Sequence, residues 1–585
     1  MFDSPILRAV TLAGLAALTL SSCGKKDAQP STSALTSPDS VLAHVPADTP
    51  YLLASGAPFP DDLLDKLEPA TDQMLRAYQT VVREIIVAAF EEYAETDEAA
   101  DEEVDPEKAA AVFNEFASLL SIEGLREIGV TRDTEFAMYG VGLWPVTRIE
   151  VSDPKLFEDA IGRIEAAADT KMEVAEIDGN AYRYVGEEGA DEGKLVVGIF
   201  ENDVVITFVP NSFGDAELEK IFGLDGPAES IASTGRLAEM TREYGLTPHI
   251  SGFFDTVGMV SMFIDEPSGL NALMFEASDY DAADLSDVCR AEIREMANVA
   301  PLVVFGYSEV TEENFRGKML VRLRDDLAAA MTGLASVVPG LGIDTGALAS
   351  FGMSVDLEAA RGFYEDRLDA MESDPYECEY FQELQAGVAE GRMALQQPIP
   401  PIVYGLRGLN VSIDDAADLD FASDEPPEDV DASVLIAVDD APSLVAMGAM
   451  FSPELAALNL QPDGKPVPLD LGQYGVVTEG AFAALSDQAL VVSVGEDAEA
   501  RATTALGAES TSPPLSMGVT MNASVYYAMM AESMMDADSD ELSYEARAAM
   551  RDGMLAISEI FDRMTFDIRF VEKGLEIESN TTLKD

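Results

Sequence analysis

The most constraining feature of this 585-residue sequence is an internal repetition. A strand-like segment, a helix, an acidic loop, a second helix and a closing pair of strands recur four times. Units of this kind bury their apolar faces against their neighbours, so the repetition favours an architecture of similar units packed side by side. The first strands of the units read YLLASG from Tyr51, ISGFFD from Ile250, SFGMSVD from Ser350 and SMGVTMN from Ser516.

The closing strands share an aromatic-glycine pair in three of the four units. They read EFAMYGVGL from Glu135, LVVFGYSEV from Leu302, PIVYGLRGLNV from Pro401 and MTFDIRFVE from Met564. The pairs are Tyr139-Gly140, Phe305-Gly306 and Tyr404-Gly405, and the fourth unit has Phe566-Asp567. Glycine within a strand marks a bulge or a close approach of two backbones, which explains the pair without a ligand.

Two long inserts divide the units into pairs. In the insert between units one and two, a helix is expected from Pro154 and strands are expected around 172–177, 182–185, 195–200 and 204–209. The insert between units three and four is expected to contain strands near 434–438, 482–485 and 490–494. The sequence therefore predicts an α+β fold of two duplicated halves, residues 42–345 and 346–585, each with an antiparallel or mixed sheet covered by helices.

The first 22 residues have the features of an export leader. The apolar run from Ala9 to Leu20 has twelve residues, too few to span a bilayer but typical of a signal peptide. Leu20-Ser21-Ser22-Cys23 resembles the lipobox of bacterial lipoproteins, which implies cleavage before Cys23 and lipid attachment to its thiol. An ordinary secretory leader followed by an incidental cysteine is the alternative.

The segment after the leader predicts a tethered protein. Residues 23–41 are rich in Ser, Thr, Pro and Ala, as in a flexible linker. In lipoproteins an aspartate after the cysteine favours the inner membrane, so Gly24 favours the outer membrane. We expect a body in the periplasm whose partner is the membrane, reached through acyl chains on Cys23.

The composition is strongly acidic. There are 108 Asp and Glu against 36 Lys and Arg, a formal charge of −72. This charge repels phosphate backbones, so nucleic acid is not expected as a partner. A solvated acidic surface explains the charge, and attraction of divalent cations or of a basic protein is the alternative.

Cys289 and Cys378 are the two cysteines outside the leader region. In an oxidising compartment two remaining cysteines most simply form one disulfide. Cys289 lies near the start of the second helix of unit two, and Cys378 lies near the start of the second helix of unit three. These equivalent positions support a bridge between the two units. Two buried thiols are the alternative.

Residues suited to catalysis are sparse. His44 and His249 are the only histidines, and neither lies near a nucleophile motif. The sequence contains no zinc, phosphate-loop or dinucleotide motif, so we predict that the protein is not an enzyme. A hydrolase that uses two carboxylates remains an alternative, because no motif is needed for such a pair.

Acidic runs recur in the loop between the paired helices. The last run offers alternate oxygen ligands at Asp536, Asp538 and Asp540, a candidate calcium site. The central glycine and terminal glutamate of an EF-hand are missing, and a solvated loop explains the run equally. Otherwise no cofactor is expected.

Unit four is rich in methionine. Flexible thioethers can line an apolar groove that accepts varied ligands, although ordinary core packing also explains them. The residues are Met529, Met530, Met534, Met535, Met550, Met554 and Met564.

The segment VLAHVPADTPYLLAS, Val41 to Ser55, resembles a family of uncharacterised bacterial envelope lipoproteins that open with V-P-A-D-T-P-Y. The resemblance implies an envelope location and carries no catalytic residue. Our leading hypothesis is a non-catalytic lipoprotein that binds or scaffolds another envelope component. A carrier or chaperone for an apolar ligand is the alternative.

Overall fold

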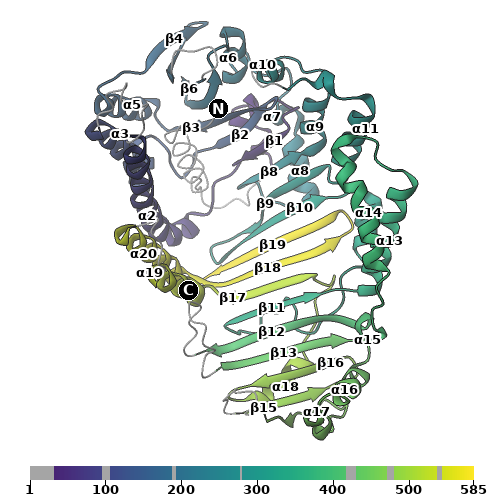
Figure 1. Cartoon of the computed structure of the whole chain (residues 1–585). Coiled ribbons are helices and arrows are strands. Elements are labelled where there is room, and N and C mark those ends of the chain that lie inside the picture. Colours follow the sequence, from purple (N-terminus) through teal and green to yellow (C-terminus); the bar gives the residue numbers. More distant parts are fainter. Residues whose placement is uncertain are drawn as a thin grey trace.

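The computed structural model describes residues 32–94, 106–186, 193–276, 280–416, 430–470, 480–536 and 543–584. The protein is α+β, with 43% helix and 28% strand. Its strands form one continuous sheet of 19 strands, all antiparallel (Figure 1). The sequence predicted a sheet for each half; instead, strands from both halves pair directly at the centre.

The strand order is read inward from each edge. From one edge the strands are β4 (Glu173–Ile177), β5 (Asn180–Gly186), β6 (Gly193–Phe200), β7 (Asp203–Pro210), β3 (Trp144–Glu150), β2 (Phe136–Val141), β1 (Tyr51–Ala54), β8 (Ser251–Asp255), β9 (Leu302–Val310) and β10 (Asn314–Arg322). From the other edge they are β14 (Val467–Pro468), β15 (Ala481–Leu485), β16 (Ala489–Val494), β13 (Val430–Val438), β12 (Leu406–Ala416), β11 (Ala349–Ser354), β17 (Met517–Asn522), β18 (Phe561–Val571) and β19 (Gly574–Leu583).

The pairing of β10 with β19 joins the two series. Its register runs from Asn314 opposite Thr582 to Arg322 opposite Gly574. The two strands are far apart in the chain, and no local sequence pattern in either strand specifies the other as its partner.

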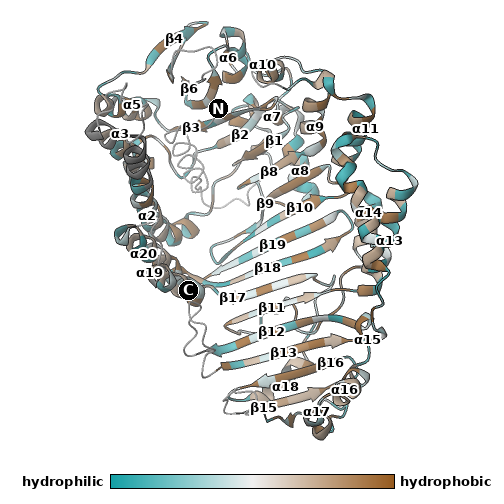
Figure 2. Cartoon of the chain, viewed as in Figure 1, coloured by the Kyte–Doolittle hydropathy of each residue, from teal (hydrophilic) through white to brown (hydrophobic). Residues whose placement is uncertain are grey.

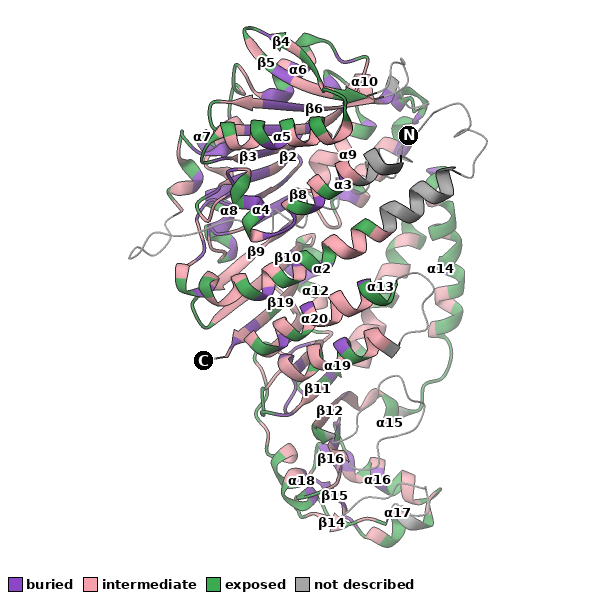
Figure 3. Cartoon of the chain, turned by 90° about the vertical axis from the view of Figure 1, so that its left-hand side faces the viewer, coloured by how far each residue is buried: buried purple, intermediate pink, exposed green. Residues whose placement is uncertain are grey.

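Long helices flank the sheet at both ends of its strands (Figure 1). The first helical arm consists of α2 (Asp61–Ala94), α19 (Ala523–Asp536) and α20 (Tyr544–Ile560), with α3 (Pro106–Leu119) and α4 (Ile122–Glu127) beside α2. In Figure 3 this arm crosses in front of the strands. The second helical arm consists of α9 (Thr256–Ile264), α10 (Leu270–Glu276), α11 (Asp287–Ala297), α13 (Leu357–Ser373) and α14 (Gln382–Leu395).

Helix boundaries follow capping residues. The side chain of Ser286 accepts the Cys289 amide at the start of α11, Asp356 accepts the Ala359 amide at α13, and Ser543 accepts the Ala546 amide at α20. Such caps satisfy amides that the first helical turn leaves without a partner.

One side of the sheet, which we call the packed face, carries the main core. In the first half, Leu52, Tyr139 and Phe253 are buried against α6 (Asp215–Phe222), α7 (Ile231–Thr234) and α8 (Arg236–Tyr244). In the second half the same face lies under Val338, Leu341, Leu515 and α18 (Ala498–Leu506). We call the opposite side the open face, because large apolar side chains in its central part are exposed to solvent.

Two of the three aromatic-glycine pairs mark close backbone approaches, as predicted. A Cβ on Gly140 would lie 2.4 Å from the Gly142 carbonyl oxygen, and one on Gly306 would lie 2.6 Å from the Ile250 oxygen. Gly405 differs, because α15 (Pro401–Tyr404) is a helical turn and β12 begins only at Leu406. The predicted strand from Pro401 was therefore wrong at its start, where consecutive prolines lack the amides that a strand donates.

Candidate functional site

The central part of the open face carries two rows of uncharged side chains. Residues directly opposite each other in antiparallel strands project to the same side, so the register defines each row. The first row is Phe305, Met319, Ile577, Ile568, Met517, Met353, Leu409 and Ile436. The second row is Tyr307, Gly317, Ser579, Phe566, Val519, Phe351, Val411 and Val434. We call these residues the apolar floor.

The apolar floor is half-buried to exposed, and the contrast between the two faces is clearest in β11. Phe351 is 40% and Met353 is 45% exposed, while their neighbours Gly352 and Ser354 are buried. Figure 2 shows hydrophobic residues alternating with more polar ones along these strands. Strands normally turn their larger apolar side chains toward the core, and a large exposed apolar area marks a binding surface.

The buried polar side chain on the packed face of β11 is hydrogen-bonded within the protein. The Ser354 hydroxyl donates to the Leu515 carbonyl oxygen at 2.6 Å and accepts from the Ser336 amide at 3.0 Å. A Cβ on Gly352 would lie 2.7 Å from Leu341, so the strand lies close to the segment that covers it. These contacts fix which side of β11 is covered.

Short helices border the apolar floor at both ends. On the open face, Ile161 of α5 (Pro154–Ala168) packs with Val197 and Val204 of the first series of strands. At the other end, α16 (Ala441–Ala449) and α17 (Pro453–Leu458) pack on β15 and β16 through Val445 and Leu485. Between them the middle of the floor stays uncovered. At its two ends, Tyr307 contacts Phe59, with ring centroids 5.5 Å apart, and Ile436 packs under α16 and α17.

A hollow of about 350 Å³ lies over the strands near the centre of the sheet. Its lining includes Leu53, Phe136, Phe305, Met319, Phe566 and Ile577. Aromatic rings and flexible methionine side chains form an adaptable apolar surface of the kind that ligand sites use.

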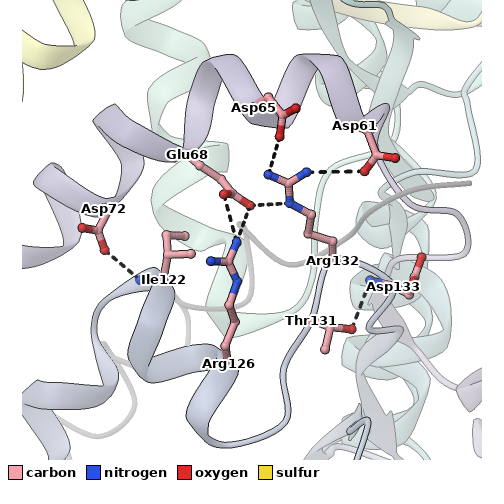
Figure 4. Close-up of polar contacts among 9 residues, drawn as sticks. All are labelled: Asp61, Asp65, Glu68, Asp72, Ile122, Arg126, Thr131, Arg132 and Asp133. Atoms are coloured by element: carbon pink, nitrogen blue, oxygen red, sulfur yellow. Dashed lines mark hydrogen bonds and ion pairs between the residues drawn. The ribbon is translucent and has the colours of Figure 1, made fainter.

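The base of the first helical arm is held by an ionic cluster (Figure 4). Arg132 contacts Asp65 at 2.7 Å and Asp61 at 3.4 Å, and Arg126 contacts Glu68 at 2.9 Å. Hydrogen bonds from the two arginines to Glu68 lower the pKa of that carboxyl group. The cluster connects the start of α2 to the segment that leads into β2.

The predicted disulfide between Cys289 and Cys378 is present, with the Cα atoms 4.7 Å apart. It links the start of α11 to the residue before η5 (Glu379–Phe381) and α14. Glu292 accepts the amides of Glu377 and Cys378 beside it. The second helical arm therefore has a covalent link between segments from units two and three.

Charged residues occupy the packed face at the centre of the sheet. Lys318 pairs with Glu576 at 2.6 Å, and Arg569 contacts Glu578 at 3.0 Å. Burial raises the pKa of Asp567 to about 6, although Arg569 opposes the shift. The central strands thus have one ionic side and one apolar side, and the apolar side is the accessible one.

The two histidines lie outside the apolar floor. His249 is buried, with Nδ1 3.0 Å from the Thr247 hydroxyl, and burial lowers its pKa to about 4. His44 lies 3.9 Å from Asp203, which also binds Arg148 at 2.8 Å. Burial is the main cause that lowers the pKa of His44.

Several predicted site residues are not described. Cys23, residues 1–22 and residues 24–31 of the predicted tether lie outside the described residues, as do Asp538 and Asp540. The rest of the predicted tether, residues 32–41, is not a flexible linker, because Leu35 and Val41 are buried in the main core. Asp536 ends α19, and its side chain is not described. Within the described ranges, no three His, Cys, Asp or Glu side chains gather in a way that would hold a metal ion.

The apolar floor was not predicted as a site. Met564 is the one member of the methionine-rich set that lies on β18, where it projects to the open face opposite Met521. The signal was present in SFGMS and SMGVT, where large apolar residues alternate with small ones. Alternation identifies two faces without telling which one the rest of the chain covers.

Among the described residues, none of the helices combines the length and the apolar character needed to cross a bilayer. In comparisons with known proteins, the chain matches no family model, and no curated protein or solved structure is significantly similar to it.

Proposed function

We propose that the protein binds the acyl chains of a lipid on the apolar floor and acts as a lipid carrier in the cell envelope. Two uncharged rows cross eight neighbouring strands. The observation that carries this proposal is the exposure of large apolar side chains within these rows, which is 37–45% at Phe351, Met353, Val434 and Phe566. The carrier hypothesis thereby replaces the scaffold hypothesis as our preferred function.

The dimensions of the floor suit acyl chains. Eight strands about 4.8 Å apart extend over roughly 34 Å. The acyl chains of one bilayer leaflet extend over about 15 Å, half of the hydrocarbon thickness. The floor is therefore long enough for a complete acyl region, and its methionines can adapt to chains of different length.

The charge of the protein selects among lipids. The residues of the apolar floor include no cation, and Lys318, which also lines the hollow, is paired with Glu576 at 2.6 Å. The chain carries a formal charge of −72. Anionic headgroups are repelled by such a surface. We expect neutral or zwitterionic lipids to bind more tightly than anionic lipids with the same chains.

A purified-protein binding assay with a fluorescent phosphatidylcholine tests the proposal. Val434→Glu places a charge on the floor, and Val337→Glu places one at a 58% exposed position outside it. Loss of one buried apolar contact weakens binding about tenfold or more. We expect this loss for Val434→Glu and wild-type binding for Val337→Glu. Equal binding by both variants would contradict the proposal, as would a wild-type protein that self-associates through this face and binds no lipid.

We also propose that the two halves arose by duplication. Read inward from its edge, the first half has the insert strands β4 to β7, then β3, β2 and β1, and then β8, β9 and β10. The second half has the insert strands β14 to β16, then β13, β12 and β11, and then β17, β18 and β19. This common order supports the proposal, together with the repeated sequence units. Solving each half separately and superposing them with matched strand order would test it.

A lipid anchor on Cys23 would position this carrier at a membrane. We propose acylation of Cys23 on the basis of its lipobox-like sequence. Metabolic labelling with a fatty-acid probe should mark the wild-type protein and leave Cys23→Ser unlabelled. Absence of label from the wild-type protein would refute the anchor without affecting the lipid-binding assay.

A further inference from the structure

The connection between α16 and α17 carries two unusually exposed apolar side chains. Met450 is 80% and Phe451 is 84% exposed. The chain from residue 441 to residue 453 contains no charged residue, in a protein of which 25% is charged. We define Met447, Met450 and Phe451 as the apolar tip. The two helices that it joins, α16 and α17, lie at the lower end of the molecule in Figure 1.

The apolar tip is supported by a packed base. Positions 447, 450 and 451 have the i, i+3, i+4 spacing that places side chains together at a helix end. In α16 Val445 is buried against the sheet, and Ser452 caps α17 by accepting the Leu455 amide. The exposure of Met450 and Phe451 is therefore a property of an ordered hairpin of helices.

The helices that carry the tip lie on the same side of the sheet as the apolar floor. The helices α16 and α17 pack on Ile436, Leu490 and Val492, which share the open face with the floor. Their outer surface consequently points away from the sheet on the side where the floor is accessible. A membrane touched by the tip would lie on the side from which a lipid enters.

The size of the tip argues against a stable protein partner. Its two most exposed side chains offer roughly 300–400 Å². A stable protein interface needs about 800 Å² from each partner. Insertion of a few apolar side chains is sufficient for reversible contact with the interfacial region of a bilayer.

The surrounding charges indicate the kind of bilayer. Asp439 and Asp440 are exposed at the other end of α16, and Asp463 is exposed after α17, where it pairs with the ammonium of Lys465. These carboxylates and the formal charge of −72 disfavour anionic headgroups. We propose that Met447, Met450 and Phe451 insert into the surface of a neutral or zwitterionic bilayer and orient the apolar floor toward it.

Tryptophan fluorescence of the full chain tests this docking. The sequence has one tryptophan, Trp144, which is half-buried and donates to the Phe208 carbonyl oxygen. Phe451→Trp adds a reporter at the tip, and Val337→Trp adds one in the segment over the packed face. Each protein is mixed with vesicles of brominated phosphatidylcholine, whose bromine quenches only fluorophores that enter the bilayer.

We expect quenching and a blue shift for Phe451→Trp beyond the Trp144 background, and neither for Val337→Trp. Adding Met450→Asp to Phe451→Trp should weaken vesicle binding about tenfold or more. Replacing a third of the lipid by phosphatidylglycerol should reduce the quenching. Equal quenching of both reporters, or a blue shift at residue 451 without quenching, would overturn the proposal. Lipid binding to the apolar floor in solution is measured separately, so either proposal can fail alone.

Discussion

Two neighbouring residues of β11 give opposite predictions under two views of the sheet. If the larger apolar side chain faced the core, Met353→Ser would strongly destabilise the protein and Ser354→Val would stabilise it. The structure reverses this order, because Met353 is 45% exposed and Ser354 is 7% exposed. Comparing the stability of the two variants therefore shows which side of β11 is covered.

The magnitudes follow from the contacts. Ser354→Val leaves the Leu515 carbonyl oxygen and the Ser336 amide without their partner, at about 1–3 kcal/mol for each buried group. We expect a total loss of about 2–6 kcal/mol of unfolding free energy. Met353→Ser removes a side chain that is only about half covered, so we expect a loss near 1 kcal/mol.

Urea denaturation of both variants, followed by circular dichroism, measures the two losses under identical conditions. A larger loss for Met353→Ser than for Ser354→Val would refute the assignment of the open and packed faces. Leu341→Met, a volume-conserving change on the packed face, serves as a control for general sensitivity of this core and should cost less than about 1.5 kcal/mol.

Three further predictions concern Asp567, His249 and the disulfide. The pKa of Asp567 is raised to about 6, so its charged form destabilises the fold above that pH; Asp567→Asn should raise Tm at pH 8 and have little effect at pH 4. The pKa of His249 is lowered to about 4, so the stability gained from its neutral ring is present above pH 6.5 and lost as the pH falls toward 4; His249→Gln should flatten that part of a Tm–pH profile. Replacing Cys289 and Cys378 by serine should lower the unfolding free energy by about 4 kcal/mol in denaturation without reductant, and an unchanged denaturation midpoint would contradict the assigned role of the bridge.

Local sequence patterns were sufficient to predict much of the architecture. The first strands at Tyr51, Ile250, Ser350 and Ser516 correspond to β1, β8, β11 and β17, and the pairing of the two cysteines followed from their number and placement. These features depend on short-range alternation, capping and redox chemistry, which a single sequence displays directly.

The joining of the halves and the apolar floor depend on contacts between distant segments. Nothing in β10 specifies β19 as its neighbour, and Ser354 is buried by Leu515, a residue 161 positions away. The pattern at Phe351 and Met353 predicted an alternating strand, and an apolar face of such a strand is ordinarily assigned to the core. Only the position of the covering segments shows that this apolar face is accessible.

Photo-crosslinking tests the central proposal most directly. A phosphatidylcholine with a diazirine in its acyl chain is incubated with the purified full-length protein, irradiated, and the modified peptides are identified by mass spectrometry. The proposal predicts modification of β11, β17 and β18 at residues such as Phe351, Met353 and Phe566, with competition by unlabelled lipid. Crosslinks confined to other segments, or no competition, would contradict lipid binding on the apolar floor.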